Sequence, residues 1–117
     1  MKEKKIKIPI FEDSITLLYG GYNDIYDFWN KTYPTLIDEF DNFHAKYWCV
    51  ADDTIKRYIL VVRDEGEKYI HHESLHATND ILHFCGVGVT NDNDEIQCRL
   101  MDYIANEVLK ELEDTDG

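Results

Sequence analysis

The pattern of hydrophobic and polar positions predicts four β-strands before residue 65. The segment "KKIKIPIF" alternates charged and apolar residues, as a half-buried strand does, and Pro9 favours a place at the edge of a sheet. The segment "SITLLYGG" predicts a second strand that ends at Gly20 and Gly21. Two runs rich in β-branched and aromatic residues, "AKYWCVAD" and "IKRYILVVRD", are joined by residues 52–54 and predict a hairpin.

The segment between the second strand and the hairpin predicts helical structure. Asn23 can cap a helix that carries three apolar residues on one face, namely Ile25, Phe28 and Trp29. Pro34 interrupts this helix, and a second turn or helix is expected around residues 36–40.

Two further helices are expected after the hairpin. Beyond "DEGE" the period of the apolar residues changes from two to about 3.6, which predicts a helix over residues 68–84 closed by Gly86. The last helix is expected over residues 94–112, after a cap by Asp92 or Asn93. Its apolar stripe consists of Ile96, Leu100, Tyr103, Ile104 and Val108, with Met101 at the border.

The order of these elements predicts an α+β fold. Strands, a helical insertion, a hairpin and two helices follow one another, so we expect a small antiparallel or mixed sheet with the helices on one face. The 117 residues suffice for one domain, expected over residues 1–112. An acidic tail over residues 113–117 is expected to be disordered.

The formal net charge of −12 narrows the classes of partner. An acidic chain repels phosphate backbones, so nucleic acid is not an expected partner, and no apolar run is long enough to span a membrane. The acidity also leaves open that the chain mimics nucleic acid and blocks a DNA-binding protein. Cys49, Cys85 and Cys98 lack CxxC spacing and no secretory signal is present, which predicts reduced core thiols in a cytoplasmic protein.

The segment "HHESLHATND", residues 71–80, carries a candidate catalytic motif. His72 and His76 are one helical turn apart, so both imidazoles project from one face and can reach one metal ion. Glu73 lies about 100° further round the helix, beside the ligands, where it can take a proton from a water that the metal activates. The pattern H-E-x-x-H on a helix therefore predicts a catalytic zinc site.

A catalytic zinc ion usually has three protein ligands and one open position, so a third ligand is needed. The metzincin arrangement is absent, because Asn79 and Leu82 stand where that pattern has a glycine and a histidine. The alternative is a carboxylate at the start of the last helix, where Glu95 is preferred to Asp94 for its longer reach. Asp94 would then cap the helix or orient a ligand histidine.

These residues resemble a family of small zincin-like proteins from bacteriophages and other mobile elements. The similarity is carried by "HHESLHATNDILHFCGV" and "NDNDEIQCRLMDYI", and it covers about residues 69–109. The resemblance implies a minimal gluzincin-type metallopeptidase fold, related broadly to the ImmA/IrrE and SprT-like groups. It also implies that His72, His76 and Glu95 are the zinc ligands and that Glu73 is the general base.

The chain departs from the gluzincin pattern at Arg99, which stands where some members have an acidic residue one turn after the third ligand. An arginine there can orient a zinc-bound carboxylate, or it can mean that the two helices meet in a different way. Tyr103 and His83 are candidates for stabilising the oxyanion, although an ordinary structural position suits both better. Asn79 shares the face of His76 and can hydrogen-bond a ligand or the substrate.

The sequence thus predicts a zinc-dependent metallopeptidase whose substrate strand lies along the hairpin edge. The expected partner is a peptide or protein, including a protein of the bacterial host if the chain is phage-encoded. One alternative is a catalytically silent zincin-fold protein that binds and inhibits a host protein. A second is a structural zinc site, in which Asp94 or His83 fills the fourth position.

Overall fold

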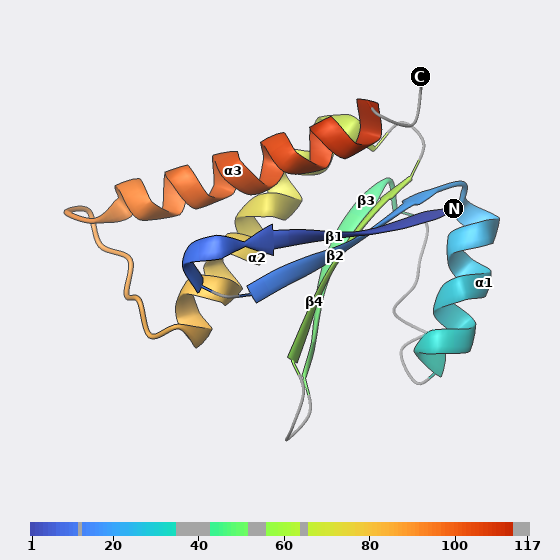
Figure 1. The fold of residues 1–117 in the computed structure, drawn as a ribbon, viewed down its shortest axis with the longest axis horizontal. Coiled ribbons are helices and arrows are strands. Elements are labelled where there is room, and N and C mark those ends of the chain that lie inside the picture. The colour runs from blue at the N-terminus through green and yellow to red at the C-terminus, as the bar shows by residue number, and fades with distance from the viewer. Residues whose placement is uncertain (12, 35–42, 52–55, 64–65, 114–117) are drawn as a thin grey trace.

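The described part of the chain forms a four-stranded mixed sheet with helices on both faces (Figure 1). The structure is a computed structural model and describes residues 1–11, 13–34, 43–51, 56–63 and 66–113. The strands are β1 (Lys2–Ile8), β2 (Asp13–Gly20), β3 (Ala45–Ala51) and β4 (Lys56–Arg63), in the spatial order β1-β2-β4-β3. The β1–β2 and β3–β4 pairs are antiparallel, whereas β2 and β4 are parallel.

These strands confirm the α+β class, the hairpin and the position of β1 at an edge. The two inner strands, β2 and β4, are apolar on both faces of the sheet. In β4, Tyr58, Leu60 and Val62 face one side and Ile59 and Val61 face the other, and all five are almost fully buried. A strand that is buried on both faces needs a covering layer on each side.

The helices supply these two layers. α2 (Ile70–Phe84) and α3 (Asp94–Glu113) cover one face, as expected. α1 (Tyr22–Thr32) covers the other face, where Trp29 packs on Trp48 with ring centroids 4.4 Å apart. The expectation that all helices lie on one face of the sheet is therefore wrong for α1. The β-branched and aromatic residues of the inner strands indicated strands, but they did not show that both faces of these strands are buried.

Two local expectations differ in detail from the structure. Gly21, and not Asn23, is the cap of α1, and Asn23 lies inside its first turn. Cys85 and Cys98 are exposed, so the expectation of core thiols is wrong for both, whereas Cys49 is half-buried and packs against the core. The turn expected at residues 36–40, the link at 52–54 and all of the acidic tail after residue 113 lie outside the described residues.

The ends of α2 follow from glycines on either side of it. Gly66 is buried before the short 3-10 helix η3 (Glu67–Tyr69), and a Cβ at this position would meet the backbone carbonyls of His44 and Arg63. At the other end Gly86 has a φ of 77°, and the N–H groups of Gly86 and Val87 donate to the carbonyls of His83 and Leu82. This is a Schellman motif, so Gly86 closes α2 as expected.

The apolar stripe expected on α3 is present, but only part of it is buried. Leu100, Ile104 and Val108 are buried, whereas Ile96 and Tyr103 are each 36% exposed. None of the helices in the described ranges is long and apolar enough to cross a membrane.

Candidate metal centre on helix α2

Helix α2 runs beside the outer strand β3, and a groove of about 520 Å³ lies between them. Residues 46–49 of β3 form one wall, and four polar residues of α2 form the other, namely Glu73, His76, Asn79 and Asp80. The phenol of Tyr47 reaches from β3 to α2 and donates a hydrogen bond of 2.9 Å to Asp80 Oδ2. Burial, reinforced by Asp80, raises the pKa of Tyr47, so the phenol remains a protonated donor.

Alternate residues of β3 direct their backbone N–H and C=O groups toward the side of this groove. The Arg63 N–H donates to the His44 carbonyl at 2.8 Å. Because hydrogen-bonded pairs alternate along an antiparallel ladder, the even-numbered residues of β3 direct their N–H and C=O groups toward β4. The N–H and C=O groups of Tyr47 and Cys49 therefore face the outer edge. The Tyr47 N–H donates to the Glu73 carboxylate, so α2 satisfies one group of that edge.

His72 and His76 converge on the exposed surface of α2. Their Nε2 atoms are 3.2 Å apart, and their rings are inclined at 76° with centroids 4.9 Å apart. Two nitrogen ligands of a tetrahedral zinc ion, each about 2.0–2.1 Å from the metal, are roughly 3.3–3.4 Å apart. The pair therefore fits two positions around one zinc ion. The same separation suits an N–H···N bond between neutral rings.

Glu73 is half-buried on the groove side of the histidine pair. Burial raises the pKa of its carboxyl. His76, His72, the Tyr47 N–H and Lys46 act in the opposite direction without cancelling the effect of burial. Glu73 is therefore a carboxylate of increased basicity that lies between two imidazoles and the edge of a strand.

The structure does not bring Glu95 to the histidine pair. The Glu95 carboxylate is 73% exposed and contacts Arg99 Nε at 3.4 Å within α3. Gln97 Nε2 donates to Asn79 Oδ1 at 2.6 Å, which fixes the face that the first turn of α3 turns to α2. Glu95 is two residues before Gln97 and so points about 200° round the helix, away from α2.

The register of the two helices explains this outcome. Gln97 is opposite Asn79, and the helices are antiparallel, so residues before 97 lie beyond the C-terminal end of the histidine pair. In this antiparallel register the buried Leu100, three residues after Gln97, is the α3 residue at the level of His76. Asp94 lies in the other direction, toward His83. Across the described ranges, no three His, Cys, Asp or Glu side chains form a group that could hold a metal ion.

The other candidate residues divide between the groove and the rest of the molecule. Asn79 lines the groove, as its helical spacing from His76 predicted. Tyr103 donates to the Lys7 carbonyl at 2.9 Å and lines a different cavity together with Arg99. His83 is exposed, and its ring packs against Phe84.

Sequence reasoning missed Tyr47 and Asp80, which connect the two walls of the groove. For Asp80 a signal was present, because it is four residues after His76 and therefore on the same helical face. For Tyr47 the only signal was its place in the strand that leads the hairpin.

Comparison with known proteins returns no match. No family model, no curated protein and no solved structure matches the chain. The resemblance to small zincin-like proteins therefore stays an expectation from the sequence, and the function is inferred from the geometry of the groove.

Proposed function

We propose that the groove between β3 and α2 is the active site of a zinc-dependent metallopeptidase. In this proposal His72 and His76 hold the metal, Glu73 is the general base, and the substrate lies along the outer edge of β3. The observation that carries the proposal is the placement of two imidazole nitrogens, 3.2 Å apart, beside a half-buried carboxylate that contacts an edge strand.

The side chains of the groove suit the proton transfers of peptide hydrolysis. Bound zinc would polarise the peptide carbonyl and acidify a water molecule. The Glu73 carboxylate lies beside the histidines, so it is available to accept a proton from the attacking water and donate it to the leaving amine. Because burial raises the pKa of Glu73, this proton is accepted and returned closer to neutral pH.

The outer edge of β3 suits an extended peptide. The outward N–H and C=O groups of Tyr47 can form ladder hydrogen bonds with an added strand. Glu73 accepts the Tyr47 N–H in the free protein. A substrate carbonyl that took over this N–H would release the Glu73 carboxylate inside the groove, so binding of the peptide would free the base.

Zinc titration tests the metal-binding part of the proposal. We expect metal-stripped protein to bind one Zn²⁺ per chain and to be stabilised by about 2.7 kcal/mol when free zinc is 100 times Kd. His72→Ala and His76→Ala should each weaken zinc binding by about 100-fold or more, because a ligand contributes more than the groups that only orient it. His71→Ala, an exposed histidine on the same helix, is the control. Unchanged zinc affinity in the His72→Ala, His76→Ala double variant would contradict the proposal.

The role of Glu95 as third ligand stays a prediction and has its own test. Glu95 would have to exchange Arg99 for the metal, and the first turn of α3 would have to rotate past the Asn79–Gln97 bond. A Glu95→Gln variant with about 100-fold weaker zinc binding would support this rearrangement. Wild-type zinc affinity in that variant would show that water or substrate completes a two-histidine site.

Peptide cleavage tests the catalytic part of the proposal. With zinc bound, the wild-type protein should cleave members of a diverse peptide library. Glu73→Gln should retain zinc and lose cleavage by about 10²–10⁴-fold, the range of general-base catalysis. Glu67→Gln, an exposed glutamate before α2, is the matched control.

The alternative function is that of a catalytically silent protein that binds a host protein. Two observations favour it: no third donor joins the histidine pair among the described residues, and the net charge of −12 suits a basic partner. A stable complex recovered equally with wild type and Glu73→Gln, without cleavage of the captured protein, would support this alternative and contradict the peptidase.

A further inference from the structure

The groove between β3 and α2 has an acidic end that the proposed chemistry does not use. Asp80 lies on α2 seven residues after Glu73, which is about 10 Å along a helix. An extended peptide covers this distance in about three residues. The half-buried Asp80 lines the groove, so a peptide that lies along β3 can place a side chain against its carboxylate.

Tyr47 connects the two carboxylates of the groove. Its backbone N–H donates to Glu73, and its phenol donates to Asp80 Oδ2 at 2.9 Å. The half-buried ring therefore extends from the edge of β3, at Glu73, to Asp80. A carboxylate can accept about four hydrogen bonds, so the bond from the phenol does not saturate Asp80.

A strand added to β3 would direct one side chain along the Tyr47 ring. Residues directly opposite each other in an antiparallel pair project from the same face of the sheet. The peptide residue that exchanges its backbone hydrogen bonds with Tyr47 would therefore project toward α2, as Tyr47 does. Tyrosine and arginine side chains are similar in length, so an arginine at this position would bring its guanidinium beside the phenol and Asp80.

A guanidinium suits this surface in two ways. It is planar and stacks on the face of an aromatic ring, which Tyr47 offers. It also donates parallel hydrogen bonds to a carboxylate, which Asp80 offers. A lysine carries a strongly hydrated point charge and lacks the planar fork, so arginine is the better match.

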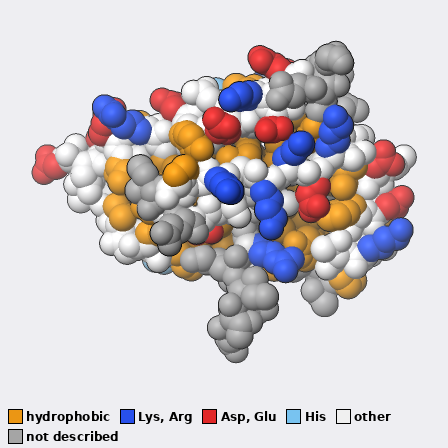
Figure 2. Space-filling model, in the orientation of Figure 1, with side chains coloured by type: hydrophobic (Ala, Val, Ile, Leu, Met, Phe, Trp, Pro, Cys, Tyr) orange, Lys and Arg blue, Asp and Glu red, His pale blue; other side chains and the backbone are white. Residues whose placement is uncertain are grey.

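The positive charge of the chain is placed mostly elsewhere. Lys46 is the one Lys or Arg among the described residues that line the groove, and its Nζ lies 5.0 Å from the centroid of Trp48, in the cluster under α1. Four of the twelve Lys and Arg residues are in β1, the outer strand at the opposite edge of the sheet. Figure 2, in the orientation of Figure 1, shows Lys and Arg side chains across the middle of the molecule. The Asp80 end of the groove therefore favours a cationic side chain.

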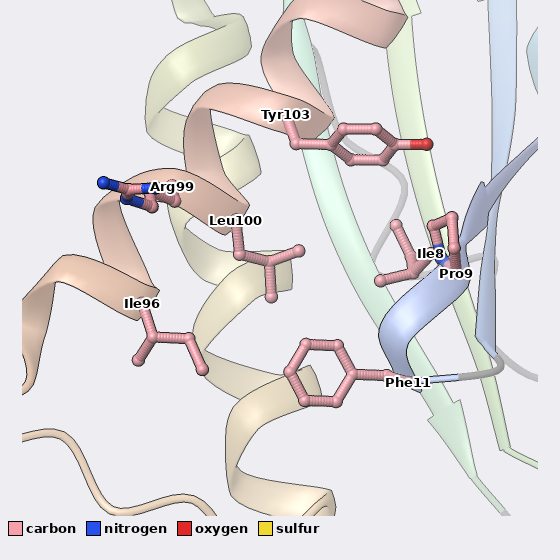
Figure 3. Close-up of a pocket in the computed structure, with 7 residues that line it drawn as sticks. All are labelled: Ile8, Pro9, Phe11, Ile96, Arg99, Leu100 and Tyr103. Atoms are coloured by element: carbon pink, nitrogen blue, oxygen red, sulfur yellow. The ribbon is translucent and has the colours of Figure 1, made fainter.

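The large cavity at the other edge of the sheet offers no such contact. It measures about 440 Å³ and lies between the short 3-10 helix η1 (Pro9–Phe11) and α3 (Figure 3). Its walls are apolar side chains, and Figure 3 shows the Arg99 guanidinium directed away from them. The Tyr103 hydroxyl donates to the Lys7 carbonyl, so only its ring is offered to a ligand. A charged side chain is therefore selected by the groove and not by this cavity.

We propose that the groove selects an extended peptide with an arginine at the position that pairs with Tyr47. The guanidinium stacks on the Tyr47 ring and binds the Asp80 carboxylate. This inference rests on the proposed function for the course of the peptide along β3, and it names the substrate class of that site. The substrates are peptides with an arginine within about three residues of the cleaved bond. Asp80 determines specificity and takes no part in proton transfer.

Peptide binding to Glu73→Gln protein tests this selection without cleavage. The probes are acetylated and amidated octapeptides of serine and threonine with arginine, citrulline or glutamate at one central position. Citrulline has nearly the shape of arginine and no charge. By calorimetry, with zinc and in metal-free protein, we expect the arginine peptide to bind about ten-fold more tightly than the citrulline peptide, as for one charge-assisted contact. Equal affinities, or no binding at millimolar peptide, would overturn the proposal.

Variants of Asp80 locate the contact. Asp80→Asn keeps an acceptor for the phenol and removes the charge, so the arginine and citrulline peptides should bind equally. Asp80→Glu keeps the charge and should retain the preference for arginine, which a loss of folding would not allow. Asp102→Asn, an exposed aspartate of α3, is the control with the same change in net charge. A preference that survives Asp80→Asn, or that is lost equally in Asp102→Asn, would overturn the assignment to Asp80.

Cleavage of a diverse peptide library separates this inference from the proposed function. With zinc bound, the wild-type protein should cleave peptides enriched in arginine at one fixed position within about three residues of the cleaved bond. Asp80→Asn should lose this enrichment. Cleavage without the enrichment would overturn the selection by Asp80 and leave the peptidase standing. Arginine-selective binding without cleavage would support the arginine site and contradict the peptidase.

Discussion

Glu73 shows how one residue can be costly for stability and suited to chemistry. Its carboxyl is partly removed from water, and the groups that favour the charged form do not fully compensate for burial. Groups with raised pKa values are typical of sites that move protons. The same burial means that the ionised form weakens the fold.

The pH dependence of stability tests this cost. The pKa of Glu73 is raised in the folded state, so folding favours its protonated form. The contribution of Glu73 to stability is therefore full below the ordinary glutamate pKa of 4.5 and is lost as the pH rises through the raised value. In metal-free protein, Glu73→Gln should raise the melting temperature at pH 7 and leave it unchanged at pH 4.

Glu67→Gln serves as the control in this pH series. It removes an exposed glutamate from η3, one helical turn and a half before Glu73. A rise in melting temperature at pH 7 that is the same in both variants would assign the effect to the net charge of the molecule.

The contact between Tyr47 and Asp80 acts at the level of elements, because it joins strand β3 to helix α2. Tyr47→Phe removes the donor and leaves the Asp80 carboxylate without it. We expect a loss of about 1.5–3 kcal/mol in the free energy of unfolding, as for a hydrogen bond to a charged group. Urea denaturation measures this loss, and Tyr69→Phe, an exposed tyrosine, should change it little. A double-mutant cycle with Asp80→Asn that shows no coupling would contradict the contact.

Gly66 sets the path from β4 into α2. A Cβ at residue 66 would meet the backbone of His44 and Arg63, which cannot turn aside as a flexible side chain can. Gly66→Ala should therefore cost about 2 kcal/mol or more in unfolding free energy and displace the start of α2. Gly88→Ala is the control, because nothing lies within 4 Å of a Cβ there. Equal stability of the two variants would show that the turn adapts easily.

The elements themselves were largely predictable from the sequence. Alternation gave the strands, the change of period gave α2, and the conformational freedom of Gly86 gave its end. Each of these signals is local, because it depends on residues within one or two turns of each other. The same holds for His72 and His76, whose proximity follows from one turn of helix.

The relations between elements were not predictable in the same way. The face covered by α1 depends on the packing of Trp29 against Trp48, which are distant in the sequence. The direction of Glu95 depends on the pairing of Gln97 with Asn79, and a shift of two residues in α3 reverses it. Spacing fixed the distance along the chain from His76 to Glu95 but not the rotation of α3 against α2.

At the scale of the whole molecule, charge is unevenly distributed. The chain has 24 acidic and 12 basic residues, and four of the basic ones are lysines of β1. Self-repulsion of like charges destabilises a compact state, and salt screens it over about 10 Å at 0.1 M. The melting temperature should therefore rise between 10 mM and 300 mM NaCl, as followed by circular dichroism. A fall over this range would show that attractive pairs dominate.

The parallel pairing of β2 with β4 has a consequence for the growing chain on the ribosome. β1 and β2 are complete once residue 20 has been made, but Ile15 finds its partner only when Tyr58 has emerged. During that interval one edge of β2 and both its apolar faces are open to other chains. Chains truncated before residue 56 should consequently pellet on centrifugation, whereas chains extended through residue 113 should not. The chain is thus most prone to aggregation while it is being synthesised, and this tendency ends only when β4 has been made and pairs with β2.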